Sequence, residues 1–445
     1  MRVANFLRRQ PVWLRWLLAV AAVAVVERLA MLAFYPAVAY DDTPSYRRLA
    51  EAILNGWVGY DGTRTPGYPF LLAWVGPDQR VYLLQLLMGL AVTLVFFWVG
   101  WQLSGKPGFG AAAALAHTLN LGQLFFEANL LTETLTTFWL ALAALAVFEA
   151  ARRKGAARFA WALAGGLLGG LAGLTRPLFF FVPVWIAIFL LFTAWREGWR
   201  ARLAGFAAPL LPGVLIAGLW IGYIYNTYHI FSVTVMNGYH LVQHTGYFFE
   251  YVPDEDAALR DTYLRYRDER IAEYGTQGNT IWGAIPELQQ VTGLSFYDLS
   301  RKLASVSVNL IREHPLLYAR TVVKGWWMFW RAPFYWQPEA IVMPGLRALF
   351  SGLVTAQRGG LVLVNLVFVI ASLLVLSWKR ARGAARMNAY LWFIGGLIWL
   401  SSVAQTLPDH GDNPRFLIPL QSWVVFCVLW LAWSAIQSLK RQSKR

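Results

Sequence analysis

Long apolar runs alternate with short polar segments along most of this chain. A helix rises about 1.5 Å per residue, so runs of about 20 residues cross a hydrocarbon layer of about 30 Å. The pattern predicts ten membrane-spanning helices, at 12–35, 81–103, 111–128, 130–150, 159–175, 177–195, 204–224, 360–378, 388–405 and 416–437. The fold class is therefore expected to be an all-α polytopic membrane protein.

Two pairs of these runs lie unusually close together. Almost nothing separates 111–128 from 130–150, and Pro177 stands where 159–175 would otherwise continue into 177–195. Proline interrupts helix hydrogen bonding, so a break is expected there. A re-entrant pair is an alternative at either place.

The distribution of lysine and arginine orients the predicted spans. With the N-terminus in the cytoplasm, six basic segments fall on the same side: "MRVANFLRR", "GKPG", "ARRKGAAR", "REGWRAR", "KRARGAAR" and "KRQSKR". Such an excess marks cytoplasmic loops. Both termini are therefore predicted to be cytoplasmic.

Composition supports a membrane protein rather than a nucleic-acid-binding one. The 445 residues are 58% hydrophobic and only 14% charged. The formal charge of +15 is explained by the orientation signal, so no nucleic-acid partner is expected. The one cysteine, Cys427, excludes an intrachain disulfide and a cysteine-based zinc site.

Two polar regions fall on the predicted outer side. In 40–80, a turn precedes apolar residues at helical spacing, which predicts a short amphipathic helix along the membrane. The longer region, 225–359, contains a charged helical stretch, "DEDAALRDTYLRYRDERIAEYG". It also contains "REHPLLYARTVVKGWWMFWRAPFYW", whose aromatic residues suit an interfacial helix. No further folded unit is expected, so 1–445 is interpreted as one transmembrane domain.

The first outer region combines acids with a confined arginine. Asp41 and Asp42 follow the first span, and "GTRTPGYP" is expected to hold Arg64 in a stiff, extended turn beside Gly67. A carboxylate accepts a proton from an attacking hydroxyl, and a guanidinium binds a phosphate by paired hydrogen bonds. Together they suit transfer from a lipid-linked phosphate.

Five stretches in order resemble one family over nearly the whole chain. They are "DDTPSYRRLAEAILNG…RTPGYPFLLAW", "NLLTETLTTFWLALAAL", "GGLAGLTRPLFFFVPVW", "REHPLLYARTVVKGWWMFW" and "NPRFLIPLQSW". They resemble the bacterial branch of the GT-C membrane glycosyltransferases, which is similar to the dolichyl-phosphate-mannose protein mannosyltransferases (family 39) and the aminoarabinose lipid A transferases. The resemblance implies an inverting glycosyltransferase. Its donor is a polyprenyl-phosphate-linked sugar, used on the outer face of the cytoplasmic membrane.

The resemblance also suggests roles for individual residues. The family's catalytic acid is followed four residues later by tyrosine, which selects Asp42 with Tyr46. Asp41 stays the alternative, because this sequence has two adjacent aspartates. Arg64 is similar to the family's phosphate-contacting base before a Gly-Tyr pair, here ending in Tyr68.

Further polar residues border the predicted outer surface. Glu133 is either a helix-terminal acid next to a capping Thr132 or a pocket acid, as the resemblance suggests. Arg176 either anchors the chain at headgroup level or contacts the donor phosphate. Arg415 matches the arginine of the family's "PRF"-like ending and is a third candidate for the donor headgroup.

The loop before the last predicted span is the remaining candidate. His410 and Asp412 are expected to line the substrate pocket, and no cofactor is expected to be required. Together with Asp409 they offer three ligands that could bind a divalent metal, although such clusters in loops are mostly solvated. His240, His244 and His314 are not expected to contact substrate.

Two other functions fit parts of the pattern. A lipid-linked sugar flippase or transporter would also have many spans, but the polar residues gather at the outer surface rather than at mid-membrane. A glycan polymerase or ligase would consume similar carriers. The sequence decides neither the sugar nor whether the envelope acceptor is protein, lipid or glycan.

Overall fold

A computed structural model describes residues 10–193, 198–332, 334–409 and 413–442. Within these ranges the chain is helical, with a single isolated bridge between Val38 and Asn129. Among the described residues, seven helices are long and apolar enough to cross a membrane: α2 (Val12–Phe34), α5 (Asp78–Ser104), α8 (Glu133–Arg152), α9 (Gly155–Thr175), α11 (Trp199–Tyr228), α17 (Pro344–Ser377) and the one at Pro414–Lys440, which overlaps α20 (Ile418–Gln442). The prediction of an all-α polytopic membrane protein is confirmed.

Two of the ten predicted spans are divided, and a third is a helix as predicted but is not among these seven. The 111–128 run is divided into α6 (Pro107–Thr118) and α7 (Leu121–Ala128), because the helix ends at Leu119 and Asn120 caps the next one. The 177–195 run is a 3-10 turn, η1 (Pro177–Phe181), followed by α10 (Val182–Thr193), as expected after a proline. The 388–405 run is α19 (Ala389–Thr406), which is not among the seven.

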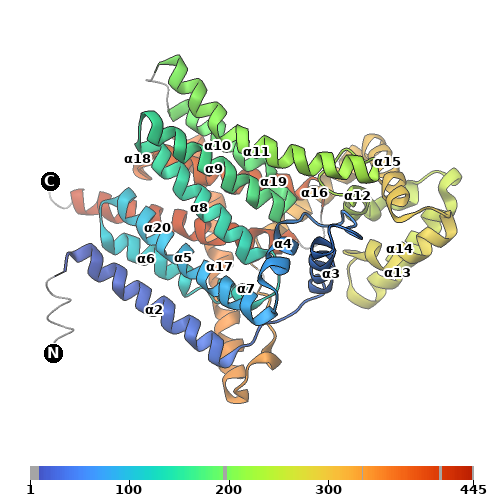
Figure 1. Cartoon of the computed structure of the whole chain (residues 1–445), viewed down its shortest axis with the longest axis horizontal. Helices are drawn as coiled ribbons and strands as arrows, with labels where there is room; N and C mark the ends of the chain where they lie inside the picture. Colours follow the sequence, from blue (N-terminus) through green and yellow to red (C-terminus); the bar gives the residue numbers. More distant parts are fainter. Residues whose placement is uncertain (1–9, 194–197, 333, 410–412, 443–445) are drawn as a thin grey trace.

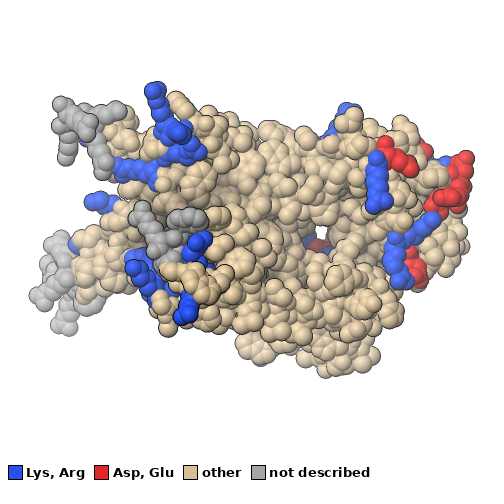
Figure 2. Space-filling model, turned by 90° about the horizontal axis from the view of Figure 1, so that it is seen from above, with Lys and Arg blue, Asp and Glu red and all other residues tan. Residues whose placement is uncertain are grey.

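The long helices form one bundle, and α2 begins at the same end at which α20 finishes (Figure 1). Small residues allow the closest packing in it: a side chain at Gly166 of α9 would meet the backbone of Pro209 in α11. Exposed basic residues gather at that end, whereas the opposite end carries both signs of charge (Figure 2). The exposed basic residues at the end where α2 begins include Arg152, Arg153, Lys154, Lys379 and Arg380.

A second group of helices covers the opposite end of the bundle (Figure 1). We call these the cavity-side helices: α12 (Asn237–Thr245), η2 (Gly246–Tyr251), η3 (Asp254–Asp256), α13 (Ala257–Tyr274), α14 (Thr280–Thr292), α15 (Phe296–Glu313) and α16 (Pro315–Phe329). Both helices predicted in this region, the charged one and the aromatic one, are present as α13 and α16. The outer region predicted at 225–359 overlaps the next long helix, because α17 already begins at Pro344, after η4 (Pro338–Ala340), and not near residue 360.

Two short helices join the bundle to the cavity-side helices. The amphipathic helix is confirmed as α3 (Thr43–Leu54), whose Leu49 packs into the core of the cavity-side helices. The next segment differs from the expected extended turn, because α4 (Gly67–Val75) begins immediately after Pro66. Proline is tolerated in a first helical turn, where no helix hydrogen bond is lost. A side chain at Gly67 would lie 2.7 Å from the carbonyl oxygen of Leu174, so glycine permits this contact with α9.

The charged residues of the first span have partners on other helices. Arg28 donates to Glu127 at 2.6 Å and to Thr118 at 2.8 Å, and Thr118 donates to Glu27 at 3.0 Å. The Arg28 side chain is 6% exposed and that of Glu127 is 3% exposed. This network connects α2 with α6 and α7 and explains how two charges are accommodated inside the bundle.

Candidate active site

A cavity of about 650 Å³ lies where the bundle meets the cavity-side helices. Its walls come from helix ends and loops that are distant in sequence: the start of α3, the loop before α4, the α9–η1 junction, α12, α14 and the segments on either side of residues 410–412. In the space-filling view an opening lies in this part of the molecule, with charged atoms visible inside (Figure 2).

Asp42 lies at the start of α3 and faces the cavity. Its Oδ1 accepts from Arg64 Nη2 at 2.6 Å and its Oδ2 accepts from Arg415 Nη1 at 2.7 Å. Asp41 is exposed and does not line the cavity. Of the two adjacent acids, the geometry favours Asp42 as the one that acts in this site.

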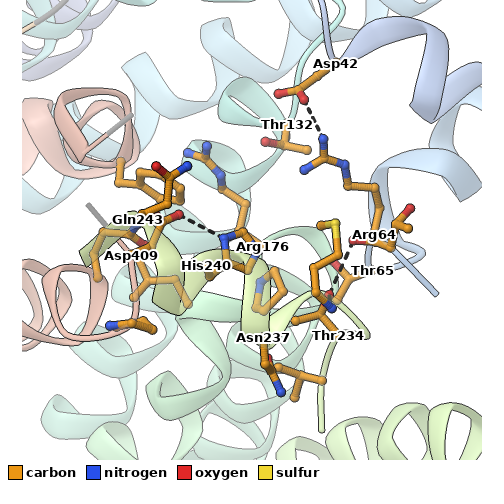
Figure 3. A pocket seen from close by; sticks show the side chains of 18 of the residues that line it. Asp42, Arg64, Thr65, Thr132, Arg176, Thr234, Asn237, His240, Gln243 and Asp409 are labelled. Atoms are coloured by element: carbon orange, nitrogen blue, oxygen red, sulfur yellow. Dashed lines mark hydrogen bonds and ion pairs between the residues drawn. The ribbon is translucent and has the colours of Figure 1, made fainter. Parts of the chain in front are cut away.

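Arg64 reaches the cavity from the loop between α3 and α4. The Tyr60 hydroxyl donates to the Arg64 carbonyl at 3.0 Å, and the guanidinium carbon lies 5.6 Å from the ring centre of Tyr46. The first contact holds the Arg64 backbone, and the second holds its side chain beside Asp42 (Figure 3). Its buried Nε has no hydrogen-bond partner among the described residues.

Arg415 and Arg176 share a buried carboxylate. Arg415 donates to both oxygens of Glu133, and Arg176 Nη2 lies 3.2 Å from Glu133 Oε1. The Glu133 side chain is fully buried, and those of both arginines are less than 10% exposed. Arg176 therefore faces the cavity and is not a headgroup anchor. Within the described part of the chain, nothing hydrogen-bonds its buried Nη1.

The interpretation of Glu133 is refined by these contacts. It occupies the first turn of α8, but the Thr132 side chain does not cap that helix. Glu133 lies behind the cavity wall and holds two arginines in place, so it supports the site without lining it. Tyr68 is likewise buried: its ring packs edge-on against Tyr46 and its hydroxyl donates to Gln85 at 3.0 Å.

The electrostatics of this cluster are asymmetric. Three guanidiniums from Arg64, Arg176 and Arg415 face two carboxylates, Asp42 and Glu133, which leaves one net positive charge. Burial raises the pKa of Asp42, but Arg64 and Arg415 together outweigh burial and hold that pKa below its usual value. Asp42 is therefore ionised at neutral pH. Arg64 and Arg176 each keep one nitrogen that no described residue hydrogen-bonds, so the cluster is suited to an anion.

The other side of the cavity contains His240, which the sequence did not predict to lie near substrate, and Asp409, which it offered only as a possible metal ligand. Nδ1 of His240, on α12, is 3.1 Å from Oδ2 of Asp409. This pair lies across the cavity from Asp42 and Arg64 (Figure 3). Gln243 on α12 and Trp282 on α14 also line this side. Histidine spacing alone gave no signal for His240, because its partner lies 169 residues away. By contrast, His244 hydrogen-bonds Thr321 and His314 packs against Tyr251, as expected for structural residues.

Two predicted residues, His410 and Asp412, lie outside the described residues. Among the residues that are described, no three or more His, Cys, Asp or Glu side chains come together as a metal-binding group. The metal alternative therefore gains no support from this part of the chain.

Comparison with known proteins gives limited information. The chain matches no protein-family model and no curated protein. A solved structure with a similar arrangement is ArnT from Cupriavidus metallidurans bound to undecaprenyl phosphate. The sequences are 14% identical, the similarity covers 95% of this chain and 77% of that chain, and the TM-score is 0.39. At this identity and TM-score the likeness does not decide the function.

Proposed function

We propose that this protein is a GT-C-type glycosyltransferase that takes one sugar from a polyprenyl-phosphate donor. The observation that carries the proposal is the arginine cluster. Three guanidiniums converge where apolar helices end, and two of them keep a buried nitrogen without a partner in the described structure. A phosphate at the end of a long apolar chain is the ligand that fits both the charge and the position.

The charge of the cluster matches the donor. A polyprenyl phosphate sugar is a phosphodiester with one negative charge, which the net positive charge of the cluster balances. When the bond from phosphate to sugar breaks, the leaving polyprenyl phosphate gains negative charge beside Arg64, Arg176 and Arg415. Fixed cations placed where charge develops stabilise a transition state strongly.

Asp42 is the candidate base of this proposal, with Asp41 as the weaker alternative. Its two oxygens are occupied by Arg64 and Arg415. A bound phosphate competes for both guanidiniums, which leaves the carboxylate able to accept the proton of an acceptor hydroxyl. The hydroxyl oxygen then attacks the anomeric carbon while the phosphate leaves from the opposite face, so the configuration inverts.

The membrane topology of this proposal comes from the distribution of basic residues. We place the basic end in the cytoplasm by the positive-inside rule and the cavity on the outer side of the cytoplasmic membrane. The acceptor is then an envelope protein, lipid or glycan. The cavity lies at helix ends rather than at mid-membrane, which favours transfer over flipping.

A reconstituted assay tests the proposal. Purified protein in lipid nanodiscs is mixed with decaprenyl phosphate esters of labelled mannose, glucose or arabinose and with an envelope extract. We expect release of decaprenyl phosphate and an acceptor-bound label for one sugar. Donor that stays intact with every sugar and extract, or that is only moved between leaflets in liposomes, would refute the proposed activity.

A further inference from the structure

The cavity has a second polar end that the phosphate site does not use. His240 and Asp409 form it, with side chains 25% and 13% exposed. His240 comes from α12, one of the cavity-side helices, and Asp409 from the segment after α19. A phosphate at the arginine cluster leaves this part of the 650 Å³ cavity available to another group.

The pairing with Asp409 orients the imidazole. The carboxylate accepts the Nδ1 hydrogen at 3.1 Å, so in the neutral ring Nε2 carries the lone pair. No described residue hydrogen-bonds that nitrogen. His240 therefore presents an acceptor of fixed direction to the cavity.

Aromatic and amide groups lie next to this acceptor. The Trp282 ring is 5.8 Å from the His240 ring at an interplanar angle of 75°, and it stays 36% exposed although it lines the cavity. Gln243 Nε2 donates to Asn279 Oδ1 at 3.0 Å, and the Asn279 backbone N–H donates to Gln243 Oε1 at 2.9 Å, which fixes both side-chain amides beside it. An apolar ring face together with oriented polar groups is a combination suited to a ligand with both kinds of surface.

We propose that His240, Trp282, Gln243 and Asn279 form a subsite for a sugar ring, with Asp409 positioning His240. The ring's hydroxyls pair with the imidazole and the amides, and its C–H face packs against the indole. This inference rests on the proposed function, since it assigns the rest of the same cavity. The sugar is either that of the donor or one belonging to a glycan acceptor.

Binding measurements separate these two sources. The first measures the Kd of labelled decaprenyl phosphate and of its mannose, glucose and arabinose esters for wild type, His240→Leu and Trp282→Leu. The second uses saturation-transfer NMR to detect methyl mannoside, methyl glucoside and methyl arabinoside on the same proteins, with saturating decaprenyl phosphate present. His229→Leu and Trp74→Leu are matched controls, because both side chains are exposed away from the cavity.

The expected results differ between the sources. For a donor sugar, both cavity variants weaken a sugar ester about tenfold or more while leaving sugar-free decaprenyl phosphate unchanged. For an acceptor sugar, donor affinities stay the same and the NMR signal of a methyl glycoside is lost in both variants. An Asp409→Asn variant should show the same losses in weaker form, because it removes orientation and not contact.

Failure of this inference is distinguishable from failure of the proposed function. If decaprenyl phosphate binds but neither cavity variant differs from its control in either measurement, the sugar subsite is wrong and the phosphate site stands. If decaprenyl phosphate does not bind at all, the proposed function fails instead.

Discussion

Replacing Arg415 with methionine tests the cluster most directly. The substitution keeps an unbranched side chain but removes the guanidinium that bonds Asp42 at 2.7 Å and both oxygens of the buried Glu133. Breaking a buried ion pair costs about 3–5 kcal/mol when a charge is left uncompensated. Glu133 keeps Arg176 at 3.2 Å, so we expect the lower limit, a loss of about 3 kcal/mol in the free energy of unfolding.

The same substitution changes the charge of the cavity. With two arginines facing two carboxylates, the net charge falls from one to zero. Each charge-assisted hydrogen bond contributes about 1.5–3 kcal/mol, so decaprenyl phosphate should bind about ten- to a hundredfold more weakly. The assays are unfolding in detergent and equilibrium binding of labelled decaprenyl phosphate. Arg312→Met is the control, since Arg312 is exposed and outside the cavity.

A double variant makes this prediction refutable. Adding Glu133→Gln to Arg415→Met removes the under-compensated buried carboxylate, releases Arg176 and returns the net charge to one. We therefore expect it to regain part of both the stability and the affinity for decaprenyl phosphate. If the double variant binds decaprenyl phosphate no better than Arg415→Met, the net charge of the arginine cluster does not control phosphate binding.

Three further predictions follow from the same geometry. Asp42→Asn should reduce transfer by a hundredfold or more, while Asp41→Asn stays within about threefold of wild type; equal losses in a turnover assay would remove the preference for Asp42. The pKa of Asp42 is lower in the folded protein than its unfolded value of about 3.9, so the ionised carboxylate stabilises the fold above that pH. This stabilisation is lost as the pH falls through the folded pKa. Unfolding temperatures should therefore show an acid decline below about pH 4 that is smaller in Asp42→Asn, and an identical decline in both proteins would contradict this. Gly67→Ala should lower the free energy of unfolding by about 1–3 kcal/mol, because the new methyl group meets the Leu174 carbonyl, whereas Gly108→Ala has open space; equal stability of the two variants would show that α4 shifts freely.

The proximity of Asp42 and Arg64 could be predicted because it is local. Both lie in one short segment, where a turn and two prolines restrict the chain. The details needed the folded chain: α4 begins at Gly67 and lies directly against α9 there, whereas the sequence pattern alone favoured an extended turn.

The convergence of the other arginines needed the folded chain. The Arg415–Glu133 contact spans 282 residues, and only the packing of the bundle brings the start of α8 next to the α9–η1 junction and the segment before α20. The resemblance to a family nominated these residues, but it did not reveal that Glu133 is buried behind them. It also gave no sign of His240 on α12, whose partner Asp409 comes from the segment after α19.

The sequence by itself determined that this protein is a membrane protein and where most of its long helices lie. A helix that crosses lipid requires a contiguous apolar run, and such a run can be recognised in the sequence without knowing how the helices pack. The sequence did not determine where an apolar run divides into two helices, as at Asn120 between α6 and α7. The tertiary structure alone decided which charges share a cavity, because contacts between helix ends depend on how whole helices pack. That packing sets the positive cluster at one side of the cavity and the imidazole at the other.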